Sequence, residues 1–222
     1  MRALTLAPLL VVLASPPAAG QPAVPYTRAD LQATVGWNNI RHPVDRTGVC
    51  CYSSDWMNAI GIAEATSGWF WTEHLRTTFD VAANSTGHQY EDASIFYNGQ
   101  QVYQPATVEV HQWQIAMGQQ YQFGHNAWFH PHVGGGVLVA FQQEQRYRQP
   151  FTYYDQAART TRTIGDASRT KTNETLVRPF ADVGFKAYVS RKVYFVHDTR
   201  FVAGPHGLDQ LAFKFGFGVD FW

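Results

Sequence analysis

Cysteine is nearly absent from this sequence, whose 222 residues include two cysteines, the neighbours Cys50 and Cys51. Adjacent cysteines rarely bond to each other, because an ordinary disulfide between them would have to close a strained ring. The pair does not lie beside the end of the N-terminal apolar segment, which argues against a lipoprotein anchor. Because no metal-binding or redox partners can be assigned to these thiols, we interpret them as loop cysteines and predict no cofactor.

The chain also lacks an excess of charge and, beyond its first residues, any apolar run as long as a transmembrane helix. With 17 basic and 17 acidic residues, it offers no basic surface for nucleic acid. Arg2 precedes an apolar run that ends in small residues around Ala18 to Gly20, which is typical of a secretory signal peptide. We therefore predict a cleaved signal peptide over residues 1–20, no transmembrane helix, and one domain over residues 21–222.

The last stretch, from Gln210 to Trp222, shows the clearest pattern in the chain, an alternation of apolar residues with polar, charged or very small ones. The apolar positions are Leu211, Phe213, Phe215, Phe217, Val219 and Phe221. A period of two indicates a strand with two different faces. Aromatic residues on one face, with Lys214 and Asp220 on the other, suit a strand with lipid outside and a polar lumen inside.

Similar alternation predicts seven further strands, some of them with a less regular pattern. The eight expected strands span residues 31–41, 56–71, 75–86, 107–123, 127–148, 174–189, 193–203 and 210–222. Long and short connections alternate between them, and Trp71, Phe123 and Tyr188 each stand just before a short one. Short turns on one side of the membrane, long loops on the other and an aromatic girdle are typical of outer-membrane barrels. The predicted fold is all-β, an eight-stranded antiparallel up-and-down transmembrane β-barrel.

The connection lengths also predict a topology. The long loops, which contain Cys50, Asp92 and Asp166, are expected outside the cell, and the short turns, with Thr72, His125 and Arg191, in the periplasm. A soluble lipocalin-like barrel that binds a ligand is the structural alternative, because alternation alone does not say which face is inside. We favour the membrane barrel, since a soluble barrel does not require long loops on one rim or an apolar file along whole strands.

Four segments carry a resemblance to a known superfamily: GWFWTEHLRTTFDV, HPHVGGGV, RPFADVGF and FKFGFGVDFW. By these the chain resembles the outer-membrane protein A-like and W-like eight-stranded barrels of Gram-negative bacteria. The resemblance implies location in the outer membrane, insertion by the barrel assembly machinery, contact with outer-membrane lipid and lipopolysaccharide, and a monomer. In such proteins the final strand marks the chain for insertion; here it would contain Phe213, Phe215, Phe217, Val219, Phe221 and Trp222, of which Trp222 departs from the apolar phase.

Charged residues on the inward faces form the main candidate site, as a lumen charge network. Its expected members are Arg76, Asp80, Glu174, Arg178, Asp182, Lys186, Asp198, Arg200 and Lys214. Because an eight-stranded interior is barely wide enough for its own side chains, paired charges are expected to fill it, with an open pore or solute site as the alternative. Removing Asp182 should therefore destabilise the barrel, and the inward Gly216 should accept serine more easily than Phe217 accepts arginine.

Two histidine motifs suggest other functions. His130 and His132 share the lumen side of one strand, a spacing that could offer two imidazoles to a metal, but no third ligand can be assigned, so we predict ordinary lumen residues and no metal. His197 and Thr199 face the lipid and precede Asp209, which distantly resembles the lipid A 3-O-deacylases. That resemblance implies His197 as base, Thr199 as nucleophile and Asp209 as the orienting acid. However, threonine replaces the family's serine and the acid follows too closely. We favour a non-catalytic barrel with a structural, surface-interaction or small-solute pore role, with the lipid A deacylase as the alternative.

Overall fold

The computed structural model describes residues 28–42, 56–57, 60–97, 99–123, 128–164, 166–205 and 207–221. Its strands are β1 (Ala29–Ile40), β2 (Ile60–Phe70), β3 (Leu75–Asn84), β4 (Gly87–Tyr97), β5 (Gln100–Gln122), β6 (Phe129–Arg148), β7 (Phe151–Asp155), β8 (Thr160–Ile164), β9 (Ser168–Tyr188), β10 (Val193–Gly204) and β11 (Gly207–Phe221). The predicted signal peptide, Cys50, Cys51, His125 and Trp222 lie outside the described residues. Within these residues no helix is long and apolar enough to cross a membrane.

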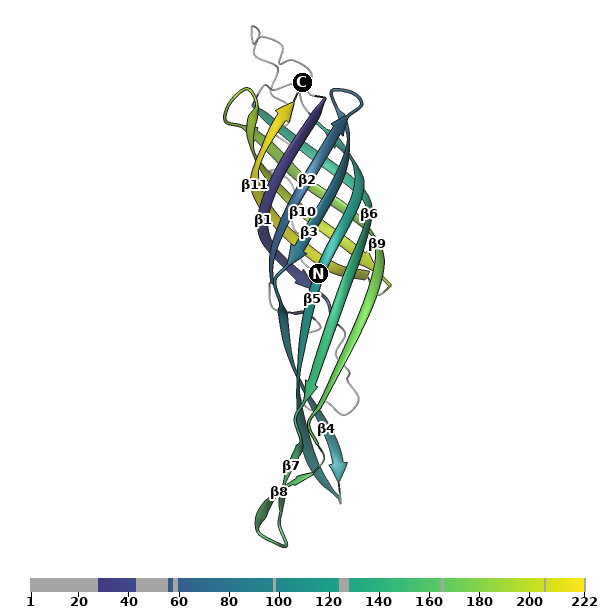
Figure 1. Ribbon diagram of the computed structural model, residues 1–222, viewed down its shortest axis with the longest axis vertical. Coiled ribbons are helices and arrows are strands. Elements are labelled where there is room, and N and C mark those ends of the chain that lie inside the picture. The colour runs from purple at the N-terminus through teal and green to yellow at the C-terminus, as the bar shows by residue number, and fades with distance from the viewer. Residues whose placement is uncertain are drawn as a thin grey trace, which may run out of the picture.

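Eight of the strands form a closed antiparallel barrel, which confirms the predicted fold class (Figure 1). Successive pairs run from β1 through β2, β3, β5, β6, β9 and β10 to β11. The barrel closes where β1 pairs with β11 over twelve positions, from Ala29 opposite Phe221 to Ile40 opposite Gln210. These eight strands correspond one for one to the eight predicted from the alternation, with shifted ends.

The barrel has apolar side chains on its outer surface and charged side chains in its interior, which is the reverse of the distribution in a soluble protein. On the outer wall Met117 is 61% exposed, Phe217 60% and Val35 56%, whereas Arg76 and Lys186 are 0% exposed inside. Large apolar side chains normally avoid water and charged ones are almost never fully buried. This arrangement fits a barrel whose exterior contacts hydrocarbon, as the sequence predicted, and the soluble lipocalin-like alternative is wrong.

The sequence predicted long loops over residues 87–106 and 149–173, and this prediction is wrong because both ranges contain strands. Instead, β4 pairs with the distal half of β5, β7 pairs with β8, and β9 begins at Ser168. With 23, 20 and 21 residues, β5, β6 and β9 are about twice the nine to eleven residues that cross a bilayer. We call the distal parts of β5, β6 and β9, together with β4, β7 and β8, the β extension. It narrows away from the barrel at the lower end of Figure 1. The outward face of these strands is largely polar, whereas Val108 and Val110 are buried with Met57 in the opposite phase to the lipid-facing file. The outward apolar alternation that identifies the barrel strands therefore does not continue into the extension.

The seam between β1 and β11 corrects the expectation for Gly216. Gly216 lies opposite Thr34, and a Cβ added to it would lie 2.0 Å from the carbonyl oxygen of Ala33. Gly36 meets the same difficulty, since its Cβ would lie 1.8 Å from the carbonyl oxygen of Phe213. Neither contact can be relieved by turning a side chain, because backbone atoms are involved. Serine at position 216 is therefore not a mild change, although the position faces inward.

We expect Phe217→Arg to impair folding strongly, because a charged side chain at mid-membrane depth costs about 2 to 4 kcal/mol. Phe217→Leu keeps the apolar surface and is the matched control, which should fold like the wild type. Gly216→Ser should also reduce folding, for the backbone reason given above. The folded fraction after refolding into detergent, measured by heat-modifiable gel mobility, checks all three; equal yields for the Arg and Leu variants would contradict the lipid-facing placement.

The arrangement of the ends predicts which residues are accessible on intact cells. Asp166 lies in the β extension between β8 and β9, and Arg191 lies in the tight turn between β9 and β10 at the opposite end of the barrel. In a Cys50→Ser, Cys51→Ser background, a membrane-impermeant thiol reagent should label Asp166→Cys and leave Arg191→Cys unlabelled. Labelling at position 191 alone would show that the topology is the inverse of the predicted one.

Candidate functional site

The first charge cluster lies inside the barrel near the tight turns and is centred on Asp30. One oxygen of the Asp30 carboxylate accepts hydrogen bonds from Arg76, 2.7 Å from Nη2 and 3.0 Å from Nε. The other oxygen accepts from Lys186 Nζ and, at 2.8 Å, from the hydroxyl of Tyr194. Lys186 also lies over the ring of Phe70, 5.0 Å from its centroid. Four strands are thus tied together through one buried carboxylate.

The second charge cluster lies further from those turns and is centred on Glu64 and Arg200. Arg200 donates from Nη1 to Glu64 at 3.0 Å and from Nη2 to Asp80 at 2.6 Å. Lys214 donates to the second oxygen of Glu64. Glu64 therefore joins both cations, and the cluster links β2, β3, β10 and β11.

Further acids surround this cluster. Asp182 lies 3.9 Å from Arg200 and accepts a hydrogen bond from Gln120 at 3.3 Å. Asp198 approaches Nε2 of His132 at 2.6 Å. Four carboxylates therefore share two cations and one imidazole. Because Arg200 is held by Glu64 and Asp80 at shorter distances, Asp182 is the weaker of its ionic partners.

Most of the predicted network is brought together, with two exceptions. The seven members in the two clusters are Arg76, Asp80, Asp182, Lys186, Asp198, Arg200 and Lys214. Arg178 instead binds Asp209 at 3.1 Å in a half-buried position. The placement of Glu174 in the lumen is wrong, because β10 pairs with β9 only as far as Phe180 and Glu174 is exposed on the β extension.

The central carboxylates of both clusters were missed from the sequence. Asp30 lies one residue before the first predicted strand, although it continues the inward file of Gln32 and Thr34. Glu64 lies in the strand predicted over residues 56–71, where small side chains leave the phase ambiguous. In each case only the register with neighbouring strands shows that the carboxylate faces inward.

Beyond the second charge cluster an apolar layer fills the barrel interior. It consists of Ala116, Leu138, Ala140, Phe180 and Val202, with Leu176 packed against it. The guanidinium of Arg200 lies over the Phe180 ring at 4.5 Å and joins this layer to the cluster beneath it. Amide side chains lie beside this layer: Gln114, which pairs with Ala140 in the sheet, donates to Gln112 at 2.7 Å and to Gln210 at 3.0 Å. The interior is therefore occupied by two charge clusters, an apolar layer and the amide side chains beside it.

The paired histidines do not act together. His130 packs its ring against Tyr188 at 5.1 Å, while His132 contacts Asp198. Among the residues that the structure describes, no group of three histidine, cysteine, aspartate or glutamate side chains is arranged to hold a metal ion.

The deacylase-like triad is not assembled. His197 and Thr199 do face outward, with Nε2 and Oγ1 3.3 Å apart, and the His197 ring packs against Phe185. Asp209, however, contacts Arg178 and lies six residues along β11 from Phe215, the residue that pairs with His197. At about 3.3 Å per residue, that separation is roughly 20 Å. The carboxylate assigned to orient the imidazole is therefore in a different part of the barrel.

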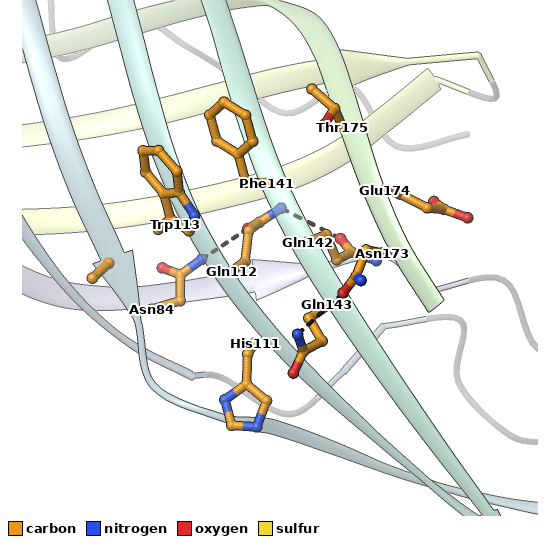
Figure 2. Close-up of a pocket in the computed structure, with 11 residues that line it drawn as sticks. Asn84, His111, Gln112, Trp113, Phe141, Gln142, Gln143, Asn173, Glu174 and Thr175 are labelled. Atoms are coloured by element: carbon orange, nitrogen blue, oxygen red, sulfur yellow. Dashed lines mark hydrogen bonds between the residues drawn. The ribbon is translucent and has the colours of Figure 1, made fainter. Parts of the chain in front are cut away.

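A groove of about 540 Å³ lies on the outer wall where β3, β5, β6 and β9 pass into the β extension (Figure 2). Trp113 and Phe141 stack beside it, with ring centroids 4.1 Å apart and planes 14° apart. Polar side chains border its other side, where Gln143 donates to Asn173 at 3.1 Å. We call this feature the wall groove; it joins an aromatic surface to an amide surface.

Known proteins resemble this chain in structure and not in sequence. No family model matches it, and no curated protein matches it. The outer-membrane protein OprG from Pseudomonas aeruginosa superposes with a TM-score of 0.53 at 12% identity, over 88% of this chain and 97% of OprG. The N-terminal barrel domain of OprF from the same organism gives 0.51 at 11% identity, over 88% and 98%. The fold is that of the outer-membrane eight-stranded barrels.

We expect Glu64→Gln to destabilise the barrel more than Asp182→Asn. The first change deprives Arg200 and Lys214 of a shared carboxylate, and breaking a buried pair typically costs about 3 to 5 kcal/mol. The second leaves Arg200 with two closer acids. Asp155→Asn, at the exposed Arg162 pair, is the control and should cost under about 1 kcal/mol. Urea unfolding midpoints in lipid vesicles measure this order; equal midpoints for all three would show that the lumen is hydrated and open.

Proposed function

We propose that this chain is an outer-membrane protein of a Gram-negative bacterium, and that its closed barrel anchors the β extension at the cell surface in a structural or surface-interaction role. The observation that carries the proposal is the filled interior. A barrel whose lumen holds two charge clusters, an apolar layer and the amide side chains beside it is built to be stable and closed. Its function is therefore expected to lie on the exterior.

A pore role is less well supported by this interior. A solute crossing the barrel would have to separate Arg200 from Glu64 and Asp80, and then displace Leu138 and Phe180 from the apolar layer. Each buried pair broken in this way leaves uncompensated charge. The small-solute alternative thus requires a conformation in which several layers rearrange together.

The β extension supports the surface role. The distal halves of β5, β6 and β9, whose outward face is largely polar, continue the barrel strands without interruption, and β4, β7 and β8 pair alongside them. A hydrogen-bonded sheet that continues from a barrel is more rigid than a loop, so it holds side chains at a fixed distance from the membrane. The similarity of the fold to OprG and to the OprF barrel domain supports the outer-membrane location.

An enzymatic role is also disfavoured, because the candidate triad is dispersed. His197 lies among Phe185 and Phe215 on the lipid side, and Asp209 is bound to Arg178 elsewhere. An imidazole and a hydroxyl without an orienting acid lack one member of the arrangement that activates a nucleophile.

The experiment is planar-bilayer recording together with a lipid A deacylation assay on the refolded protein. We expect no unitary conductance and no released acyl chain, and His197→Ala should leave both results unchanged. Stable single-channel current steps would show that the barrel is a pore and would contradict the proposed anchor role. Acyl release that is lost in His197→Ala would establish the enzyme instead.

A further inference from the structure

The outer wall around the wall groove changes character in regular steps. Because β3, β5, β6 and β9 pair in register, their outward side chains form levels that cross the strands. Moving away from the barrel, these levels are Val81, Ile115, Val139 and Val177; then Ala83, Trp113, Phe141 and Thr175; then His111, Gln143 and Asn173; then Glu109, Gln145 and Lys171; then Thr107, Tyr147 and Arg169. The wall thus passes from aliphatic to aromatic, then to amide, then to a surface with two cations.

The aromatic level marks the boundary of the hydrocarbon. The Trp113 and Phe141 rings stack with each other and continue the aliphatic wall beneath them. Aromatic side chains of this kind collect where acyl chains meet headgroups. An acyl chain lying against Val139 and Val177 therefore ends beside the groove, two residues before Phe141 and Thr175.

The amide level offers hydrogen bonds to a neutral polar partner. His111, Gln143 and Asn173 lie side by side across three strands, and Figure 2 shows them at the edge of the groove opposite the rings. Amide groups both donate and accept, so they match the hydroxyl groups of a sugar. The acid that borders the groove, Glu174, points away from these side chains in Figure 2.

The last two levels add positive charge. Lys171 and Arg169 are exposed on the outward face of β9, and Arg169 donates to Gln145 on β6. Glu109 is the acidic residue of these two levels. It lies two strands from Lys171, and its carboxylate is 3.7 Å from the His88 ring. The cations on β9 are therefore available to an anionic group that approaches along the wall.

Taken with the proposed outer-membrane location, on which this inference rests, the geometry points to a binding site for a phosphorylated glycolipid of the lipopolysaccharide type. Its acyl chains lie on the aliphatic and aromatic levels. Its saccharide occupies the wall groove against His111, Gln143 and Asn173, and its phosphates reach Lys171 and Arg169.

The height of the polar wall distinguishes this occupant from a phospholipid. Along β9, from Thr175, its member of the aromatic level, to Arg169, the strand advances six residues, about 20 Å along the strand and about 15 Å along the membrane normal at the usual tilt. The headgroup zone of a phospholipid leaflet is only about 5 to 8 Å deep. A saccharide headgroup with phosphates spans the whole graded wall, whereas a phospholipid would leave its upper levels without a partner.

The experiment uses the full-length folded protein in neutral bicelles, and native mass spectrometry measures which added lipid it retains. The lipids are rough lipopolysaccharide, the same lipopolysaccharide after dephosphorylation, and phosphatidylglycerol. The wild type should retain rough lipopolysaccharide in preference to both others. Lys171→Glu combined with Arg169→Glu should weaken that retention at least tenfold, because two attractions to the phosphates become repulsions. Gln143→Ala with Asn173→Ala should weaken retention of the dephosphorylated form as well.

Arg162→Glu is the matched control, since it reverses an exposed charge on β8 away from the groove and should bind like the wild type. Equal retention of phosphatidylglycerol and lipopolysaccharide, or retention unchanged by the Lys171 and Arg169 substitutions, would overturn the site. That failure would leave the closed, non-conducting barrel intact. A protein absent from outer-membrane fractions would overturn the proposed function, whatever lipid it retains in bicelles.

Discussion

Peptide groups inside a bilayer have no water to bind, so every strand edge that meets hydrocarbon must be paired. In this chain the pairing of β1 with β11 meets that requirement, since it joins the first and last strands of the barrel over twelve positions. Close approach of the two backbones at Gly36 and Gly216 is part of the same seam, where side chains would collide with carbonyl oxygens. Successive side chains alternate between the two faces because the strands are pleated, and closure turns these faces into a lipid-facing outside and a lumen-facing inside.

Closure of only eight strands leaves a narrow interior, which explains the chemistry found there. Long side chains such as Arg76, Lys186 and Lys214 fill space across the lumen, and buried charge of this kind must be paired. The result is a set of bonds between strands that are not neighbours in the sheet: Asp30 on β1 holds Lys186 on β9, and Glu64 on β2 holds Arg200 on β10. These cross-lumen pairs supplement the ladder around the wall and close the barrel to solutes.

The surroundings of the long strands change along their length, from hydrocarbon to water, whereas their backbone hydrogen bonding continues without a break. Where β5, β6 and β9 leave the membrane, the outward face turns from Val139 and Val177 to Gln143 and Asn173 within a few residues. The wall groove lies at this transition, beside the stacked Trp113 and Phe141. A rigid sheet that crosses the boundary keeps apolar and polar groups in fixed register, which a flexible loop would not. This is the physical reason why a lipid-binding surface is expected there and a lumen site is not.

The sequence by itself determined the barrel, because period-two contrast between residues such as Phe217 and Lys214 is a local property that survives without knowledge of partners. It also indicated most lumen charges. It did not reveal the β extension, whose strands lack the outward apolar file of the barrel, nor the inward roles of Asp30 and Glu64, which depend on the registers of β1 and β2. Only the tertiary structure decided that Glu174 is outside the lumen, that Asp209 is far from His197, and that Trp113, Gln143 and Lys171 share one wall. These are relations between strands distant in the chain, and register between strands is set by packing and closure rather than by any single segment.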